Sequence, residues 1–193
     1  MIPTAPLRAR NRLAELILAS LADAGARDEL AAIARPDAAA PTWLVDDDLP
    51  YRHLLRERAH SACAALASRP LGTAARSRGD VLDAAATLFD AYLFFEVHEL
   101  LEEFWRDARG DDREALQGLI QVAVGYQHLA NSNFAGARAL LDEGSGRLLG
   151  RRLDGIDLDA FAHAVRRSLG RLPNFDWRAV PPFPGAAFRK DPS

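Results

Sequence analysis

The chain has 193 residues, of which 49% are hydrophobic and 26% charged, and its formal net charge is −3. This is an ordinary globular balance, and the weak negative charge gives no general attraction to nucleic acid or anionic lipid. No run reaches the length of about 20 apolar residues that spans a bilayer. The single cysteine, Cys63, cannot form an internal disulfide, which fits a reducing compartment. We therefore expect a cytoplasmic protein with no nucleic-acid or membrane partner.

Residues 1–80 predict a helical N-terminal extension. Apolar side chains recur at helical spacing over residues 7–34, as one helix or as two helices broken at Gly25. Prolines and alanines near 36–43 interrupt this periodicity and indicate a linker. Another helix is expected to begin near Pro50.

Residues 81–172 predict a helical core domain. Apolar periodicity predicts helices over about residues 80–106, 113–130 and 134–149, with a last helix starting near 157. The segment 173–193 is too rich in proline for a helix and too rich in aromatic residues for a free tail, so we expect it to pack in extended form on the core. The predicted fold class is all-α, a compact multi-helix bundle with antiparallel helical hairpins and no sheet.

Polar side chains form a stripe within the strongly apolar segment FFEVHELLEEFW at 94–105. Because helix positions three, four and seven apart share a face, one side of the helix carries Phe95, His98, Glu99, Glu102 and Trp105. Apolar side chains cover much of the remaining circumference, which is typical of a central helix. We therefore expect the stripe to be partly buried and to need partners.

The following helix carries a second polar stripe, formed by Gln117, Gln121, Gly125 and His128. A short turn makes the two helices antiparallel, and Gly118 and Gly125 would let their backbones approach. The two stripes are therefore expected to face each other. Imidazole, carboxylate and amide groups are complementary donors and acceptors, so the stripes predict one hydrogen-bonded network between the helices.

Three interpretations of these residues stay open. The network could be structural, fixing the helix register, with Arg166 or Arg167 neutralising a glutamate. It could hold a divalent metal ion, because His98 and Glu102 lie four residues apart and can reach one cation, with Glu99 or His128 as a third group. HELLE departs from the HExxH zinc signature in its last position. An organic ligand or a partner protein is the third interpretation.

The region of about residues 85–170 resembles the prokaryotic family known as domain of unknown function 309. The resemblance rests on FEVHELLEEFW at 95–105, LQGLIQVAVGYQHL at 116–129 and NSNFAGARALL at 131–141. The family pattern often has a glycine-containing break before the aromatic-Glu-x-His run, whereas this chain reads FDAYLFFEVH. Two possibilities stay open here: a kink before Phe94, or a helix that continues through it. The resemblance implies a compact all-helical fold and supplies no activity. The segment 118–149 is also similar to a single tetratricopeptide-type hairpin, which keeps a peptide-binding or adaptor role open.

We expect a non-enzymatic binding or scaffold protein whose partner is an unidentified small molecule or protein, a second copy of the chain included. The alternative is a metal-dependent hydrolase that uses His98, Glu99 and Glu102. The expected ligand-binding residues are His98, Glu99, Glu102, Trp105, Gln117, Gln121 and His128, and His98 and Glu102 are the expected metal ligands. A divalent metal ion is the candidate cofactor.

Overall fold

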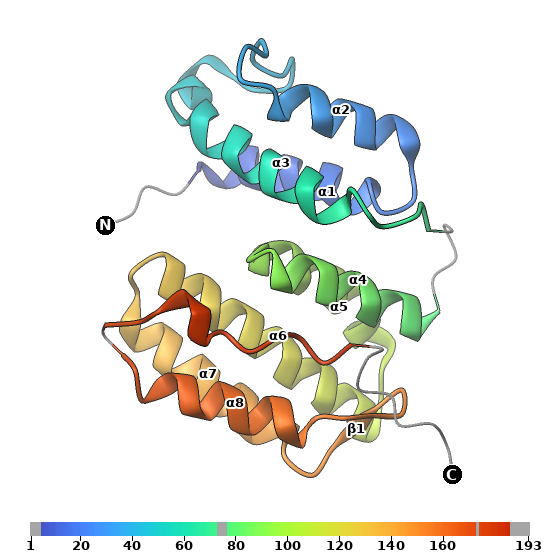
Figure 1. Cartoon of the computed structure of the whole chain (residues 1–193), viewed down its shortest axis with the longest axis vertical. Coiled ribbons are helices and arrows are strands. Elements are labelled where there is room, and N and C mark those ends of the chain that lie inside the picture. Colours follow the sequence, from blue (N-terminus) through green and yellow to red (C-terminus); the bar gives the residue numbers. More distant parts are fainter. Residues whose placement is uncertain (1–4, 73–76, 173, 186–193) are drawn as a thin grey trace. The chain divides into compact units, whose positions relative to one another are not determined.

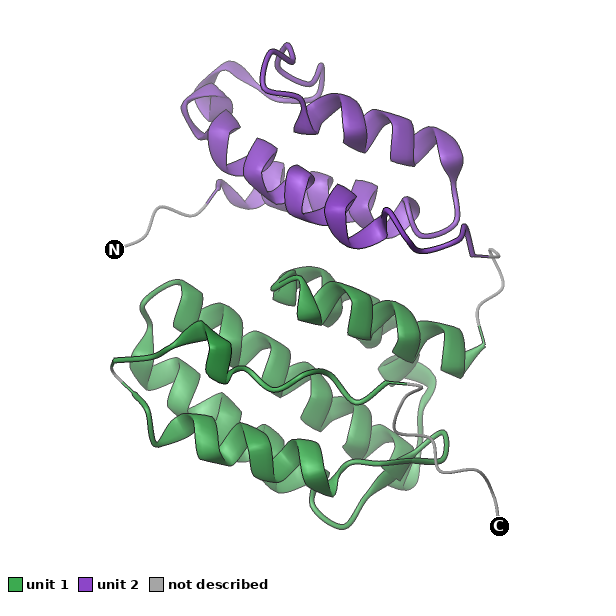
Figure 2. Ribbon diagram, in the orientation of Figure 1, with its two compact units in different colours: residues 1, 77–193 green, residues 2–76 purple. Residues whose placement is uncertain are grey.

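The computed structural model describes residues 5–72, 77–172 and 174–185. The chain divides into two compact units, residues 2–76 and residues 77–193 (Figure 2). The expected organisation into an extension over 1–80, a core over 81–172 and a terminal segment over 173–193 stays a prediction. Residue 173 and residues 186–193 lie outside the described residues.

The N-terminal unit contains three α-helices and a 3₁₀ helix within its described residues (Figure 1). They are α1 (Leu7–Ala19), α2 (Ala24–Ala34), η1 (Asp46–Tyr51) and α3 (Arg52–Leu66). Of the two possibilities for residues 7–34, the pair of helices is correct. The break precedes Gly25, because Asp23 caps α2 by accepting a hydrogen bond from Ala26 N at 2.6 Å.

The second unit contains a 3₁₀ helix, η2 (Trp177–Ala179), and five α-helices in its described part (Figure 1). The α-helices are α4 (Arg78–Asp90), α5 (Phe94–Asp107), α6 (Gly110–Ala130), α7 (Phe134–Leu148) and α8 (Asp159–Leu169). Helix α6 packs against both α5 and α7, and α8 packs on α7. The predicted all-α class is confirmed. Among the described helices, none has the length and apolar character required to cross a bilayer.

One small exception to the all-α prediction is a two-stranded antiparallel ribbon between α7 and α8. It pairs β1 (Arg152–Leu153) with β2 (Ile156–Asp157). Asp154 and Gly155 turn the chain with φ values of 50° and 79°. Strands of two residues are too short to show an alternating pattern, so this ribbon could not be predicted from periodicity.

Of the two possibilities for residues 80–106, a break before Phe94 is correct, because α4 ends at Asp90 and α5 begins at Phe94. Tyr92 adopts a left-handed conformation with φ 60°, and Leu93 N donates to Leu88 O at 2.9 Å, which closes the end of α4. The Tyr92 ring contacts Trp177, with ring centroids 5.9 Å apart. A glycine adopts this conformation without the steric cost that tyrosine bears. The break is therefore present here without a glycine.

Aromatic side chains form the centre of this unit. The Phe89 ring contacts four others, those of Phe94, Tyr126, Phe161 and Phe183, with centroid separations of 5.1 to 5.9 Å. Phe183 belongs to residues 174–185 of the C-terminal segment, which run lengthwise along the unit in Figure 1, and its backbone N donates to Asp90 Oδ1 at 3.0 Å. The described part of this segment, 174–185, thus contributes a buried side chain to the core.

Candidate functional site

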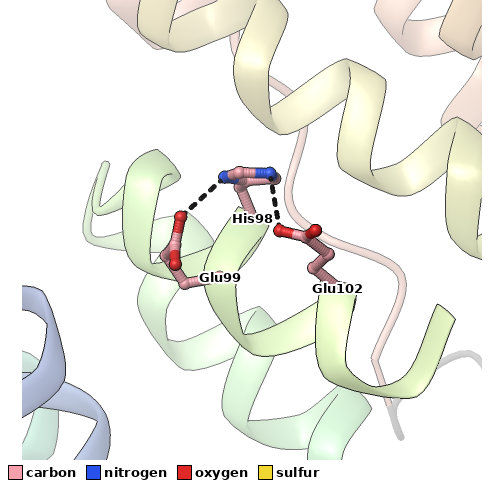
Figure 3. A group of neighbouring side chains, drawn as sticks. All are labelled: His98, Glu99 and Glu102. Atoms are coloured by element: carbon pink, nitrogen blue, oxygen red, sulfur yellow. Dashed lines mark ion pairs between the residues drawn. The ribbon is translucent and has the colours of Figure 1, made fainter. Parts of the chain in front are cut away.

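Three side chains of α5 converge on one side of the helix. His98 lies between two carboxylates: its Nδ1 is 3.1 Å from Glu99 Oε1, and its Nε2 is 3.4 Å from Glu102 Oε2 (Figure 3). The side chains are partly buried, with exposed fractions of 27% for His98 and 32% for Glu102. The helix places His98 and Glu102 on one face because they are four positions apart, and Glu99 shares a face with Glu102 because it is three positions away. We call these three residues the His98 cluster.

The His98 cluster places a negatively charged oxygen near each nitrogen of one imidazole ring. A neutral imidazole has a single N–H, and its other nitrogen carries a lone pair. In that form, the nitrogen that carries the lone pair would face a carboxylate oxygen. A metal ion bound at that nitrogen removes this conflict. The cluster is therefore suited to hold a cation.

The spacing of His98 Nε2 and Glu102 Oε2 matches that of two ligands on one tetrahedral metal ion. Zinc binds imidazole nitrogen and carboxylate oxygen at about 2.0–2.2 Å, so tetrahedral angles separate two such ligands by about 3.3 to 3.6 Å. The observed separation is 3.4 Å. Glu99 offers a third ligand atom, and the three atoms all lie within 4.8 Å of one another. These residues could therefore hold a divalent ion through two or three protein ligands.

The second carboxylate oxygen of Glu102 pairs with an arginine of the same helix. Arg106 Nη2 lies 3.2 Å from Glu102 Oε1, and the Arg106 side chain is 65% exposed. The two oxygens of Glu102 thus have different neighbours, imidazole on one side and guanidinium on the other. Arg106 was not among the residues expected at the site, although its spacing of four residues from Glu102 predicts such a pair.

Trp105 lies one helical turn beyond Glu102 and is partly buried. The Arg113 guanidinium stacks 3.8 Å above its ring, and Arg113 Nη1 donates to Trp105 O at 2.8 Å. This contact joins the end of α5 to the start of α6. Among the described residues, the buried Trp105 Nε1–H has no hydrogen-bond partner.

The expected network between α5 and α6 is wrong, because much of the second polar stripe faces α7. A Cβ added at Gly118 would meet Leu148 at 2.7 Å, and one at Gly125 would meet Leu141 at 2.7 Å. Gln121 lies on the same side: hydrogen bonds from Gln121 and Arg147 lower the pKa of the Glu143 carboxyl on α7. The glycines thus allow a close approach of α6 to α7 and not to α5.

Two further residues of the expected network also lack the contacts assigned to them. In the described ranges, no hydrogen bond joins Gln117 to His98 or Glu102. Arg166, expected as a counter-charge for a glutamate, instead donates from Nε to Ser145 Oγ at 3.3 Å. The arginine next to the His98 cluster is Arg106, on the same helix.

His128 stabilises the start of α7 and does not join the His98 cluster. Its Nδ1 lies 2.6 Å from Asn133 Nδ2, and Asn133 Oδ1 accepts a hydrogen bond from Gly136 N at 3.0 Å. A Cβ at Gly136 would lie only 2.6 Å from His128 Nδ1. The NSNFAG motif is therefore explained by a helix cap in which asparagine bonds the backbone and glycine leaves room for histidine.

One buried carboxylate was left out of the predicted site. Glu96, in the first turn of α5, is completely buried. An acidic side chain is favourable there, because the amino terminus of a helix carries a partial positive charge. Glu96 was not among the residues expected at the site, although it lies within the FEVHELLEEFW motif.

Comparison with known proteins gives one match, to a family model that covers residues 82–140. No curated protein and no solved structure shows significant similarity to the chain. The matched segment extends from α4 to the middle of α7, and includes both the His98 cluster and the Asn133 cap. It ends at residue 140, short of the residue 170 expected from the sequence motifs. Residues 82–140 match the family described as Domain of unknown function (DUF309), which confirms the resemblance for this segment.

Proposed function

We propose that the protein is a non-enzymatic binding protein that takes up a divalent transition-metal ion at the His98 cluster. The observation that carries the proposal is the 3.4 Å separation of His98 Nε2 and Glu102 Oε2, which suits two ligands of one tetrahedral ion. Glu99 either supplies a third ligand or pairs with the remaining imidazole N–H, as carboxylates beside metal-bound histidines do. Roles as a scaffold or a homodimer stay predictions.

A metal-dependent hydrolase is the second candidate. Two protein ligands would leave coordination positions for water, as catalytic zinc sites require. Catalysis also needs a base that takes a proton from that water. Glu99 is the third acidic member of the cluster, and it already lies against His98 Nδ1. Because Glu99 is already engaged with His98, this arrangement favours metal binding over hydrolysis as the function.

The experiment is thermal unfolding of tag-free protein at about pH 8, with chelator, with zinc and with manganese. We compare wild type, Glu102→Gln and Glu103→Gln. Glu103 is an exposed neighbour on α5 outside the His98 cluster, so its variant is a matched control. An ion at about 100 times its dissociation constant stabilises the folded state by about 2.7 kcal/mol. Wild type and Glu103→Gln should therefore melt at a higher temperature with metal.

The Glu102→Gln variant should lose this response. In the presence of chelator, this variant should be at least as stable as wild type, because removal of one charge relieves repulsion within the cluster. The Arg106 pair that is also lost is exposed, and such pairs contribute little. If Glu102→Gln is less stable under chelator and neither protein responds to metal, the metal proposal is refuted and the cluster is a structural network.

A further inference from the structure

A cavity of about 450 Å³ lies between α1 and the segment that leads into η1, in the N-terminal unit. Its lining comprises Arg8, Ala9, Asn11, Arg12, Glu15, Trp43 and Asp48. The volume falls within the range of about 300–1,000 Å³ typical of small-molecule sites. The lining combines an indole ring with charges of both signs, a composition that restricts the chemistry of an occupant.

Two opposite charges in this lining have no counter-ion among the described residues. Arg12 Nη1 pairs with Glu15 Oε2 at 3.0 Å, so these two neutralise each other. Arg8 and Asp48 differ: in the part of the chain that the structure describes, neither forms an ion pair with the other or with any further residue. One unpaired cation on α1 and one unpaired, half-buried carboxylate on η1 therefore line the same cavity.

Trp43 supplies an apolar wall for the cavity, and its ring is held in place. Its Nε1 donates to Glu29 Oε1 on α2 at 3.3 Å, so the polar edge of the indole is already bonded. The rest of the ring is available for apolar or aromatic contact. The buried Ala9 adds a small apolar patch to the same lining.

We propose that this cavity binds a small zwitterion of the α-amino acid class with an apolar or aromatic side chain. The ligand carboxylate pairs with the Arg8 guanidinium, which can form two parallel hydrogen bonds to it. The ligand ammonium pairs with Asp48, and the side chain lies against Trp43. This site is separate from the His98 cluster and does not depend on the metal proposal.

The test is isothermal titration calorimetry of the full-length protein with L-phenylalanine. Two analogues each lack one charge: 3-phenylpropanoate has no ammonium, and 2-phenylethylamine has no carboxylate. A hydrogen bond to a charged group contributes about 1.5–3 kcal/mol, so each analogue should bind at least about tenfold more weakly. Arg8→Gln and Asp48→Asn should weaken phenylalanine binding by a similar factor.

Asp47→Asn and Arg52→Gln are the matched controls, because both residues are exposed neighbours that do not line the cavity. Both should bind phenylalanine as wild type does. No measurable binding at about 10 mM phenylalanine, a concentration at which even a millimolar site would fill, would overturn the proposal. Equal affinity for phenylalanine and the two analogues would overturn it as well, and this comparison uses wild-type protein alone.

Discussion

Gly144 and Gly146 lie two residues apart on α7, and alanine at these positions is expected to change stability in opposite directions. A Cβ at Gly144 would lie 2.9 Å from Gly118 O and 3.0 Å from Val122 N, both backbone atoms of α6. Backbone atoms cannot rotate away, so the two helices would have to separate. A Cβ at Gly146 would meet only Arg166 Nη2, at 3.3 Å, which is the end of a flexible side chain.

The magnitudes follow from two opposing effects. Overpacking costs about 1–3 kcal/mol, and the rigid neighbours of Gly144 place its variant near the upper end. Replacing a glycine inside a helix with alanine stabilises the fold by about 0.5–1 kcal/mol. We therefore expect Gly144→Ala to lower the free energy of unfolding by about 2 kcal/mol, and Gly146→Ala to raise it by up to about 1 kcal/mol.

Urea unfolding, followed by circular dichroism and by tryptophan fluorescence, measures both free energies. The Gly146→Ala protein controls for the change in helix propensity, since it carries the same substitution in the same helix. If Gly144→Ala is as stable as wild type, or if both variants shift in the same direction by the same amount, the close contact of α6 and α7 does not limit stability and the reasoning fails.

Most helices of the second unit could be predicted from the sequence, because their apolar periodicity is long. The break between α4 and α5 could not be predicted from apolar periodicity. Tyr92 has no turn propensity of its own, and its left-handed conformation is accompanied by contact with Trp177, 85 residues later in the chain. Such a contact depends on the complete fold, and a local pattern does not contain it.

The His98 cluster was predictable from local sequence, whereas the packing partner of the α6 stripe depends on the complete fold. Spacing along one helix determines which side chains share a face, so the proximity of His98, Glu99 and Glu102 was predictable. The rotation of α6 about its own axis, which decides whether its polar stripe faces α5 or α7, could not be predicted from spacing. Its glycines indicate a close neighbour without identifying which one, and Gly118 contacts α7. The stripe of α6 was therefore assigned to the wrong partner.

Two further predictions concern the His98 cluster and the break before it. Arg106→Gln removes the guanidinium that competes for one carboxylate of the site, so zinc affinity measured by calorimetry should rise by up to about fivefold, the equivalent of an exposed pair worth at most about 1 kcal/mol. An unchanged or lower affinity would show that this pair does not oppose metal binding. The second prediction compares Tyr92→Gly with Tyr92→Ala. Both variants lose the aromatic contacts of the ring, but only alanine keeps the steric cost of φ 60°. Glycine should therefore be the more stable replacement by about 1 kcal/mol in urea unfolding, whereas at the exposed helical position Ala139 glycine should be the less stable by a similar amount. The same order at both positions would mean that the left-handed turn at Tyr92 carries no strain, and that its tyrosine is held there by packing alone.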